Sequence, residues 1–418
     1  MSLSICLYRC AAALAFSAAS PWLSRKYSGQ GLSERKGLYD RSLIDTLRRR
    51  GRPLWVHSVS VGEVQSASPF LRLAKGETKR PLLLSTITAT GREMAGRILE
   101  GVPDRTIYYP WDSPFIVDRA LDSIRPKAYV TVETEIWPSM IWEMKRRGIP
   151  SFMVNGRFSE KTLRSMRKIA PFWRDVLSCY STIMVRSDSD RDGLMSLGVD
   201  GGRIEVTGDC KLDGLMERKA SMDLSELSWI SKGQGPLIVA GSTHQGEDQI
   251  VIDAFRKVLN HHPDARLVVV PRHPDRAQDV ANVAWDTGPV CLYSCPVSGW
   301  RTMVVDKIGV LFGLYSLADA AFVGGSLVPK GGQNIMEPAI WGVPFCQGPY
   351  NDDFVQATEE LFALGVGTPV ADSDSMARAF LDDLDPERKR KVSESCEDYF
   401  SGGKEAAKRS WEIVSSCL

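Results

Sequence analysis

The feature that most constrains this chain is a regular alternation of short apolar runs with amphipathic stretches. Apolar residues recur at helical spacing in the intervening stretches, for example in 64–76 and 115–125. Such alternation is typical of βαβ units, in which helices cover both faces of a parallel sheet. We therefore predict an α/β, doubly wound Rossmann-like domain over 24–211. Its predicted strands are 54–60, 81–87, 105–110, 128–133, 151–156, 182–187 and 204–208.

The alternation stops at 212–235, where no strand pattern is found, and then resumes. A chain of 418 residues is long enough for two domains. We predict an interdomain linker at 212–235, a second Rossmann-like domain at 236–400 and a C-terminal helix at 401–418. Two such domains in tandem predict a substrate cleft at the carboxyl ends of their strands. The later predicted strands are 236–243, 265–272, 290–294, 302–307, 320–326, 344–348 and 367–371.

Composition narrows the class of protein. The 52 Lys and Arg residues nearly balance the 51 Asp and Glu residues, so bulk charge does not favour nucleic acid as a partner. The nine cysteines form no CxxC pattern and are interpreted as reduced cytosolic thiols. The five histidines lack a recognisable metal-binding spacing, so we expect no metal.

The N-terminus indicates a membrane surface. Residues 7–23 are mildly apolar but fall short of the roughly 20 apolar residues that a spanning helix needs. The same stretch also fits a signal peptide. Residues 24–52 carry nine Lys or Arg against three acids, which suits the anionic cytoplasmic face of a membrane. We predict that 1–23 associates with the cytoplasmic face of the inner membrane; a solvated arm is the alternative.

In the first half, charged residues follow three predicted strands. Glu63 comes directly after Ser60-Val61-Gly62, Glu133 ends a strand with Glu135 two residues later, and Lys211 lies just past a strand. A glutamate at a helix start can simply favour the helix dipole. The alternative is a base held at the carboxyl end of a strand, where open α/β sheets bind ligands. In that case partial burial has to offset the dipole, which lowers basicity.

The second half contains a glycine-rich pattern. Residues 324–326 end a predicted strand, and 331–332 are glycines that allow close backbone approach to a ligand. Asn334 is placed to cap a helix whose first turn holds Glu337. We predict that this helix start binds a phosphate and that Glu337 binds the hydroxyls of a ribose. Arg272 can pair with phosphate or carboxylate; a surface ion pair is its alternative.

A neighbouring motif, "GSTHQGE", places Ser242 beside His244. It is not a nucleophile elbow of the G-x-S-x-G type. We interpret Ser242 and Thr243 as turn residues or as hydrogen-bonding partners of a phosphate.

Seven segments together carry a resemblance. The resemblance covers about residues 30 to 365, and the segments are, in order, "HSVSVGEVQSASP", "YYPWDSP", "VETEIWPSMIWEMKRRGIPSFMVNGRFSEKT", "VTGDCKLD", "GSTHQGED", "VPRHPDR" and "ADAAFVGGSLVPKGGQNIMEPAIWGVPFCQGP". This set resembles the Kdo transferase family, which moves 3-deoxy-D-manno-octulosonic acid (Kdo) from CMP-Kdo onto lipid A precursors. The resemblance implies a GT-B fold, an inverting reaction without a cofactor, and a place in lipopolysaccharide synthesis. It implies an acceptor-binding N-terminal domain and a C-terminal domain for CMP-Kdo.

The resemblance also implies roles for residues. The family's general base matches Glu63, and its transition-state stabilisers match Glu133 and Lys211. Two departures occur: Ile308-Gly309-Val310 replaces Met-Gly-Glu, and Gly332-Gln333-Asn334 lacks the usual histidine, which puts a side-chain contact from Ile308 in doubt. The CMP contacts match Pro271, Arg272, Ile308, Gly309, Val310, Asn334, Ile335, Met336 and Glu337.

Two other classes of function compete with this interpretation. One is a GT-B enzyme that uses a UDP-sugar, such as a lipid A disaccharide synthase or a UDP-sugar epimerase. The other is a membrane-tethered nucleotide-binding module without catalysis, in which Glu63 has no chemical role.

Overall fold

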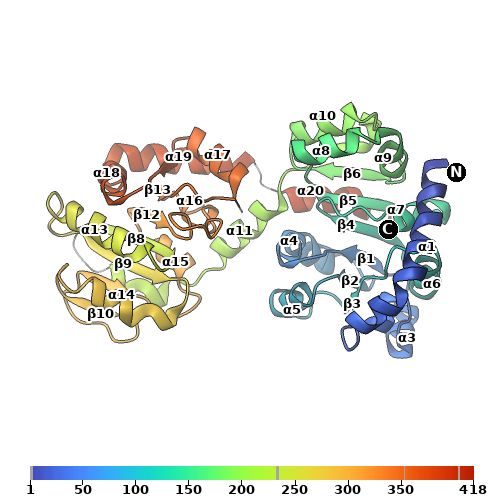
Figure 1. Cartoon of the computed structure of the whole chain (residues 1–418), viewed down its shortest axis with the longest axis horizontal. Coiled ribbons are helices and arrows are strands. Elements are labelled where there is room, and N and C mark those ends of the chain that lie inside the picture. Colours follow the sequence, from blue (N-terminus) through green and yellow to red (C-terminus); the bar gives the residue numbers. More distant parts are fainter. Residues whose placement is uncertain (1–2, 232–234, 353, 403–404) are drawn as a thin grey trace. The chain divides into compact units, whose positions relative to one another are not determined.

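The computed structural model describes residues 3–231, 235–352, 354–402 and 405–418 (Figure 1). The chain forms two compact units. Unit 1 comprises Met1–Gly214 with Gly403–Leu418, and unit 2 comprises Leu215–Gly402. All the predicted strands are present, which confirms the two doubly wound domains.

Unit 1 is built on a seven-stranded parallel sheet with the order β3-β2-β1-β4-β5-β6-β7. Its strands and helices are α1 (Leu3–Lys26), α2 (Leu32–Arg35), α3 (Arg41–Arg50), β1 (Leu54–His57), α4 (Val61–Glu77), β2 (Leu82–Thr86), α5 (Ala89–Ile98), β3 (Arg105–Tyr108), α6 (Pro114–Ile124), β4 (Ala128–Val132), α7 (Pro138–Arg146), β5 (Ser151–Gly156), α8 (Glu160–Arg167), α9 (Ala170–Leu177), β6 (Thr182–Val185), α10 (Asp188–Ser196), η1 (Gly201–Arg203), β7 (Ile204–Val206), α11 (Cys210–Ala220) and α20 (Ala406–Ser415).

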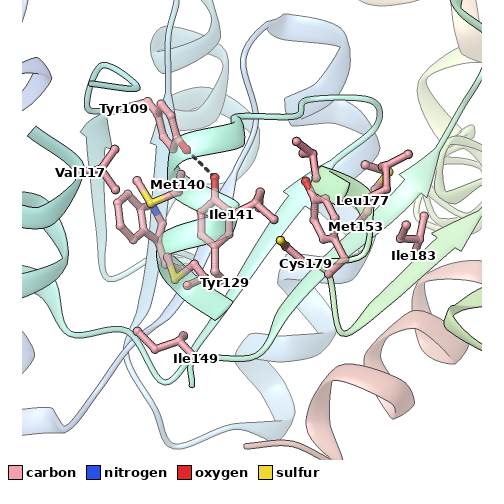
Figure 2. Packing of buried hydrophobic residues seen from close by; sticks show 14 of the residues in the cluster. Tyr109, Val117, Tyr129, Met140, Ile141, Ile149, Met153, Leu177, Cys179 and Ile183 are labelled. Atoms are coloured by element: carbon pink, nitrogen blue, oxygen red, sulfur yellow. Dashed lines mark hydrogen bonds between the residues drawn. The ribbon is translucent and has the colours of Figure 1, made fainter. Parts of the chain in front are cut away.

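Both faces of this sheet are buried, as the continuous apolar strands require. Trp55 of β1 and Tyr129 of β4 belong to one core, with helices α6 and α7. Figure 2 shows part of this core, in which the Tyr129 hydroxyl donates a hydrogen bond of 2.9 Å to that of Tyr109. Val56 and Val130 point to the opposite core, which α4, α5 and α20 complete. Alternate residues of each strand thus hold helices on opposite faces.

The strand order creates the position of the site. Strands β1 and β4 are neighbours, yet β2 and β3 extend the sheet on one side and β5 to β7 on the other. The order therefore reverses between β1 and β4, and ligands of open α/β sheets bind outside the carboxyl ends of strands at such a point. In unit 2 the reversal falls between β8 and β12.

Unit 2 is built on a second seven-stranded parallel sheet, with the order β10-β11-β9-β8-β12-β13-β14. Helices α13, α14 and α18 pack together on one face of it. Its strands and helices are η2 (Ser225–Leu227), α12 (Ser228–Ser231), β8 (Leu237–Thr243), α13 (Glu247–Leu259), β9 (Arg266–Pro271), η3 (Pro274–Arg276), α14 (Ala277–Val283), β10 (Val290–Leu292), β11 (Thr302–Val304), α15 (Leu311–Tyr315), β12 (Ala320–Val323), α16 (Met336–Ala339), β13 (Phe345–Gln347), α17 (Val355–Ala363), β14 (Gly367–Pro369), α18 (Ser373–Asp383) and α19 (Pro386–Gly402).

Helix α1 has 24 residues and is longer than the apolar stretch 7–23 noted in the sequence. Within the described residues, α1 alone has the length and composition of a helix that could cross a membrane, which by itself is weak evidence. Two polar side chains near its start contact other parts of unit 1: Tyr8 donates to Asp112 and Arg9 pairs with Glu143. The exposed face is apolar and includes Leu7 and Leu14, at 62% and 74% exposure.

The predicted linker at 212–235 is wrong for most of its length. Helix α11 runs through its first part, and residues from 215 onward belong to unit 2, where Leu227 and Ile230 are buried. No strand pattern marks this stretch because it is helical, and its apolar residues pack on unit 2. Residues 232–234, at the predicted glycine-rich end, lie outside the described part of the chain.

The predicted C-terminal helix at 401–418 is present as α20 over Ala406–Ser415. Helix α20 belongs to unit 1, where Trp411 packs edge-on against Phe70 of α4. The Trp411 indole donates a 2.6 Å hydrogen bond to Glu77. In Figure 1 the red helix α20 lies among elements of unit 1. Sequence order placed this segment after the second domain, but its apolar face completes a core of the first.

We predict that Trp411→Ala lowers the free energy of unfolding of unit 1 by about 3–5 kcal/mol, because it leaves a cavity between α20 and α4. The Trp411 side chain is 2% exposed, whereas Trp285, the matched control, is 75% exposed. Urea unfolding of the two variants measures the difference. Equal losses in Trp411→Ala and Trp285→Ala would contradict the packing of α20 on unit 1.

Candidate active site

Glu63 lies in the first turn of α4, at the carboxyl end of β1. Its carboxylate accepts hydrogen bonds from the amide of Val59 and, at 3.0 Å, from the hydroxyl of Ser60. The residue is half-buried. Its side chain is therefore fixed by the turn that joins β1 to α4, at the point where the strand order reverses.

The environment of Glu63 favours its protonated form. Burial is the largest cause and raises the pKa of the carboxyl, with a smaller contribution from the charge of Glu133. The hydrogen bonds from Val59 and Ser60 act in the opposite direction. The sequence required some compensation for the helix dipole, and partial burial supplies it.

Glu133 directly follows β4 and has a backbone φ of 58°, in the left-handed region. Its amide donates to the carbonyl of Val154 at 2.8 Å, which anchors this strained residue to β5. The Ser66 hydroxyl of α4 donates to Oε1 of Glu133 at 2.8 Å. The same oxygen lies 2.8 Å from Nζ of Lys211. Glu133 thus joins α4 to the start of α11.

Lys211 is positioned by its neighbours in the turn after β7. The amide of Cys210 donates to the side chain of Asn155 at 2.9 Å. The amide of Lys211 donates to Asp209 at 2.9 Å, and Asp209 pairs with Arg186 at 2.6 Å. The side chain of Lys211 stays 40% exposed, so its ammonium is accessible as well as paired.

Glu135 was noted in the sequence but given no role. Burial raises its pKa to about 7, and the negative charges of Glu63 and Glu133 add to the effect. Three carboxyl groups therefore share one region of unit 1 with the ammonium of Lys211. The clue in the sequence was its position two residues after Glu133, but the spacing alone did not reveal its burial.

The residues predicted to contact CMP fall in unit 2. Pro271 ends β9, and the amide of Arg272 donates to the carbonyl of Thr243 at 2.9 Å, while its side chain is exposed. Ile308, Gly309 and Val310 lead into α15. The Ile308 side chain is 82% exposed and apolar, so polar contacts from this segment come from its backbone.

Asn334, Ile335, Met336 and Glu337 form the start of α16. The side chain of Asn334 accepts a hydrogen bond of 3.1 Å from the amide of Met336, but the N-cap position is Ile335, so the predicted cap is one residue off. Glu337 pairs with Arg218 of α11 at 2.7 Å. Arg218 was not singled out in the sequence, because no pattern links it to a residue more than a hundred positions away.

The glycine-rich loop after β12 is not free to hold phosphate with its first amides. The buried carboxylate of Glu247 accepts hydrogen bonds from the amides of Gly325, Ser326 and Leu327 at 2.8, 3.0 and 2.9 Å. The Thr243 hydroxyl donates to Asp248 at 2.8 Å, so it too is engaged within the protein. Of the two alternatives for Thr243, a turn residue or a hydrogen-bonding partner of a phosphate, this contact favours the first.

Comparison with solved structures gives the class of the fold. A putative UDP-N-acetylglucosamine 2-epimerase from Listeria monocytogenes matches with TM-score 0.60 and 13% identity, over 88% of this chain and 96% of that chain. The glycotransferase of kitacinnamycin matches with TM-score 0.56 and 16% identity, over 88% and 100%. At these identities the likeness shows the fold alone. The two parallel sheets with flanking helices define a GT-B protein.

Sequence comparison then gives the family. Residues 30–214 match the family described as 3-deoxy-D-manno-octulosonic-acid transferase (kdotransferase). A probable mitochondrial enzyme of that name from Arabidopsis thaliana is 31% identical over 72% of this chain and 70% of its own length. The Haemophilus influenzae enzyme of that name is 29% identical over 84% and 82%. The chain belongs to the Kdo transferase family and is a glycosyltransferase.

A further relative is a longer protein. The bifunctional glycosyltransferase/methyltransferase of Fusobacterium nucleatum is 30% identical over 78% of this chain, and the chain spans 52% of that protein's length. The match to a bifunctional protein assigns no second activity here.

We predict that Glu63→Gln lowers the pKa of Glu135 from about 7, because the substitution removes a nearby negative charge that disfavours ionisation. NMR titration of the Glu135 carboxyl carbon measures the shift. Glu160→Gln, at an exposed position paired with Arg167, is the control and leaves the Glu135 midpoint unchanged. An unchanged midpoint in Glu63→Gln would contradict the interaction between the two carboxyl groups.

Proposed function

We propose that this enzyme transfers Kdo from CMP-Kdo to a lipid A precursor such as lipid IVA, with inversion at the anomeric carbon, in lipopolysaccharide synthesis. The observation that carries the proposal is the half-buried Glu63 at the β1/β4 reversal, beside the Glu133–Lys211 pair. Membership of the Kdo transferase family supports Kdo as the sugar that is transferred. The UDP-sugar alternative loses support, because its representatives match this chain at the level of fold alone.

In the proposed reaction Glu63 accepts the proton of an acceptor hydroxyl while that oxygen attacks the anomeric carbon of Kdo. The bond from the anomeric carbon to the phosphate oxygen breaks, and CMP leaves with the electron pair. One displacement inverts the configuration and needs a single base. General base catalysis of this kind contributes roughly 10²–10⁴-fold to a rate. The raised pKa of Glu63 makes it a stronger base than an exposed carboxylate.

Lys211 and Glu133 act as a pair in this proposal. The ammonium of Lys211 offsets negative charge on the departing phosphate, and Glu133, 2.8 Å from Nζ, holds the ammonium in place. Oriented charges stabilise a transition state without reorganising during the reaction. The scheme includes no metal and no cofactor.

Unit 2 is proposed to bind CMP through two kinds of group. Arg272 and Glu337 offer charged side chains, whereas Ile308–Val310 offer backbone groups. Gly309 has a φ of 96°, a conformation that L side chains rarely adopt, so the turn before α15 requires glycine. Unit 1 is then proposed to hold the acceptor.

We also propose that α1 and the basic residues after it bind the cytoplasmic face of the inner membrane. The outer face of α1 exposes Leu3, Leu7, Leu14 and Trp22, each more than 60%. The helix ends in Arg25 and Lys26, which suit anionic lipid. Because Tyr8 and Arg9 of α1 bind other side chains of unit 1, the helix is proposed to lie on the membrane rather than cross it.

Incubation with CMP-Kdo and a tetraacylated lipid A precursor, followed by mass spectrometry of the lipid, tests the proposed function. The expected product carries at least one added Kdo. CMP should also raise the unfolding temperature, and UDP should not. Stabilisation by UDP with no product from CMP-Kdo would favour the UDP-sugar alternative. Stabilisation by CMP with no transfer to any acceptor would favour a nucleotide-binding module.

We predict that Glu63→Gln lowers the rate of transfer at least 100-fold and leaves the Kd for CMP unchanged within twofold, because a neutral amide cannot accept the proton. In the wild type, the rate falls as pH drops through the raised pKa of Glu63, since only the ionised form is a base. Steady-state rates and calorimetry with CMP measure these effects. Near-normal turnover would remove Glu63 as the base, and a loss of CMP affinity would assign it to the donor.

We predict that removal of residues 1–26 reduces sedimentation with vesicles that contain anionic lipid, and that raised salt reduces the binding of the full chain. The truncation removes the apolar face of α1, and the salt screens the charges of its basic end and of the basic residues after it. Equal sedimentation of both forms would exclude α1 as the contact. Binding of the full chain that salt does not weaken would exclude the basic residues.

A further inference from the structure

Four basic side chains gather at one edge of the sheet of unit 2. His244 follows β8, Arg272 and His273 follow β9, and Lys330 lies in the loop after β12. Strand β8 pairs with β9 on one side and with β12 on the other. The three carboxyl ends are therefore adjacent, and β8/β12 is also where the strand order reverses. Parallel α/β sheets bind ligands at such a point.

His244 is at the centre of this group. Its ring lies 6.2 Å from that of His273, and the two rings are nearly perpendicular. Its pKa is lowered by burial first, and then by the charges of His273, Lys330 and Arg272; Glu247 acts in the opposite direction. The Nε2 atom is buried and has no hydrogen-bond partner among the described residues. A buried polar atom of this kind normally has a partner, so its partner here is a ligand or water.

The nearby carboxylates are already occupied. The oxygens of Glu247 accept four backbone amides, including that of His244 at 2.8 Å. Asp248 binds the guanidinium of Arg276 and the hydroxyl of Thr243. In the described part of the chain, neither Arg272 nor Lys330 forms an ion pair. Both side chains are exposed, and their charges remain available to an anion.

A further donor lies beside His244. Gly325 has a φ of 68°, and a Cβ built there would meet Nε2 of Gln333 and the His244 ring, each at 3.4 Å. The amide of Gln333 therefore approaches the ring across this glycine. An amide offers two N–H donors and suits the same anion as the cations around it.

We propose that His244, His273, Lys330 and Gln333, beside the proposed CMP contact Arg272, form one anion site that holds the carboxylate of the donor sugar. The proposal rests on the proposed function, in which the donor carries two anionic groups, a phosphodiester and the carboxylate of its ulosonic acid. The second of these needs cations of its own, because two anions close together cannot share one cation at full strength. The site would hold the carboxylate beside the carboxyl ends of β8, β9 and β12 and thereby fix the orientation of the anomeric carbon.

The test uses His244→Gln and Lys330→Gln in the full chain. The expected result is a KM for CMP-Kdo raised about tenfold in each variant, as loss of a charged hydrogen bond implies, with the Kd for CMP changed less than twofold. Binding of free Kdo, which carries the carboxylate without the phosphate, weakens in parallel. Lys330 is exposed, so its variant retains the fold even if His244→Gln does not.

His261→Gln and Lys391→Gln, at exposed positions of unit 2, are the matched controls and leave all three values unchanged. Glu337→Ala is the contrasting variant, and it is expected to weaken the binding of CMP. An equal loss of CMP affinity in the His244 and Lys330 variants would mean that the anion is the phosphate, and it would overturn the proposal. Unchanged KM in both variants would exclude the site. Failure of the wild type to use CMP-Kdo would instead overturn the proposed function, while binding of free Kdo still reports on the site.

Discussion

The shared contact of Glu133 with Ser66 and Lys211 is the interaction on which the rest of the site depends. One carboxylate oxygen accepts from the hydroxyl at 2.8 Å and lies 2.8 Å from the ammonium. It connects the end of β4 to α4, which carries Glu63, and to α11, which carries Lys211. The left-handed backbone of Glu133 costs of order 1 kcal/mol or more, and these contacts offset that cost.

The surroundings of Glu63 and Glu135 favour the protonated form of each carboxyl group, because burial raises the pKa of both. Glu133 pairs with Lys211, whereas neither Glu63 nor Glu135 forms an ion pair within the described residues. A base needs a pKa high enough to accept a proton and low enough to be ionised before the reaction. Glu63 reaches that state by burial against two hydrogen bonds that favour its charge. The neighbouring Glu135 has a pKa of about 7, so the total charge of the three carboxyl groups depends on pH in that range.

Unit 2 handles negative charge in the opposite way. Its glycine-rich loop offers backbone amides, as phosphate-binding loops do, but Glu247 occupies three of them. The protein's own carboxylate thus fixes the loop, and among the described residues Arg272 and Lys330 form no ion pair. In the proposed donor site, anion binding therefore falls to side chains, chiefly those around His244. The substitution of the family's usual histidine by Gln333 lies in this same group, beside His244 and Gly325.

The sequence by itself determined the strands, the two doubly wound sheets and the family, because apolar periodicity and short motifs are local properties of the chain. It also placed Glu63, Glu133 and Lys211 at strand ends, where parallel sheets bring distant residues to one edge. Only the tertiary structure decided which groups meet. The burial of Glu135, the pairing of Arg218 with Glu337 and the capture of glycine amides by Glu247 depend on contacts between distant segments. The packing of α20 on unit 1 has the same origin. An apolar face in the sequence indicates that a helix is buried, but it does not indicate which part of the protein buries it.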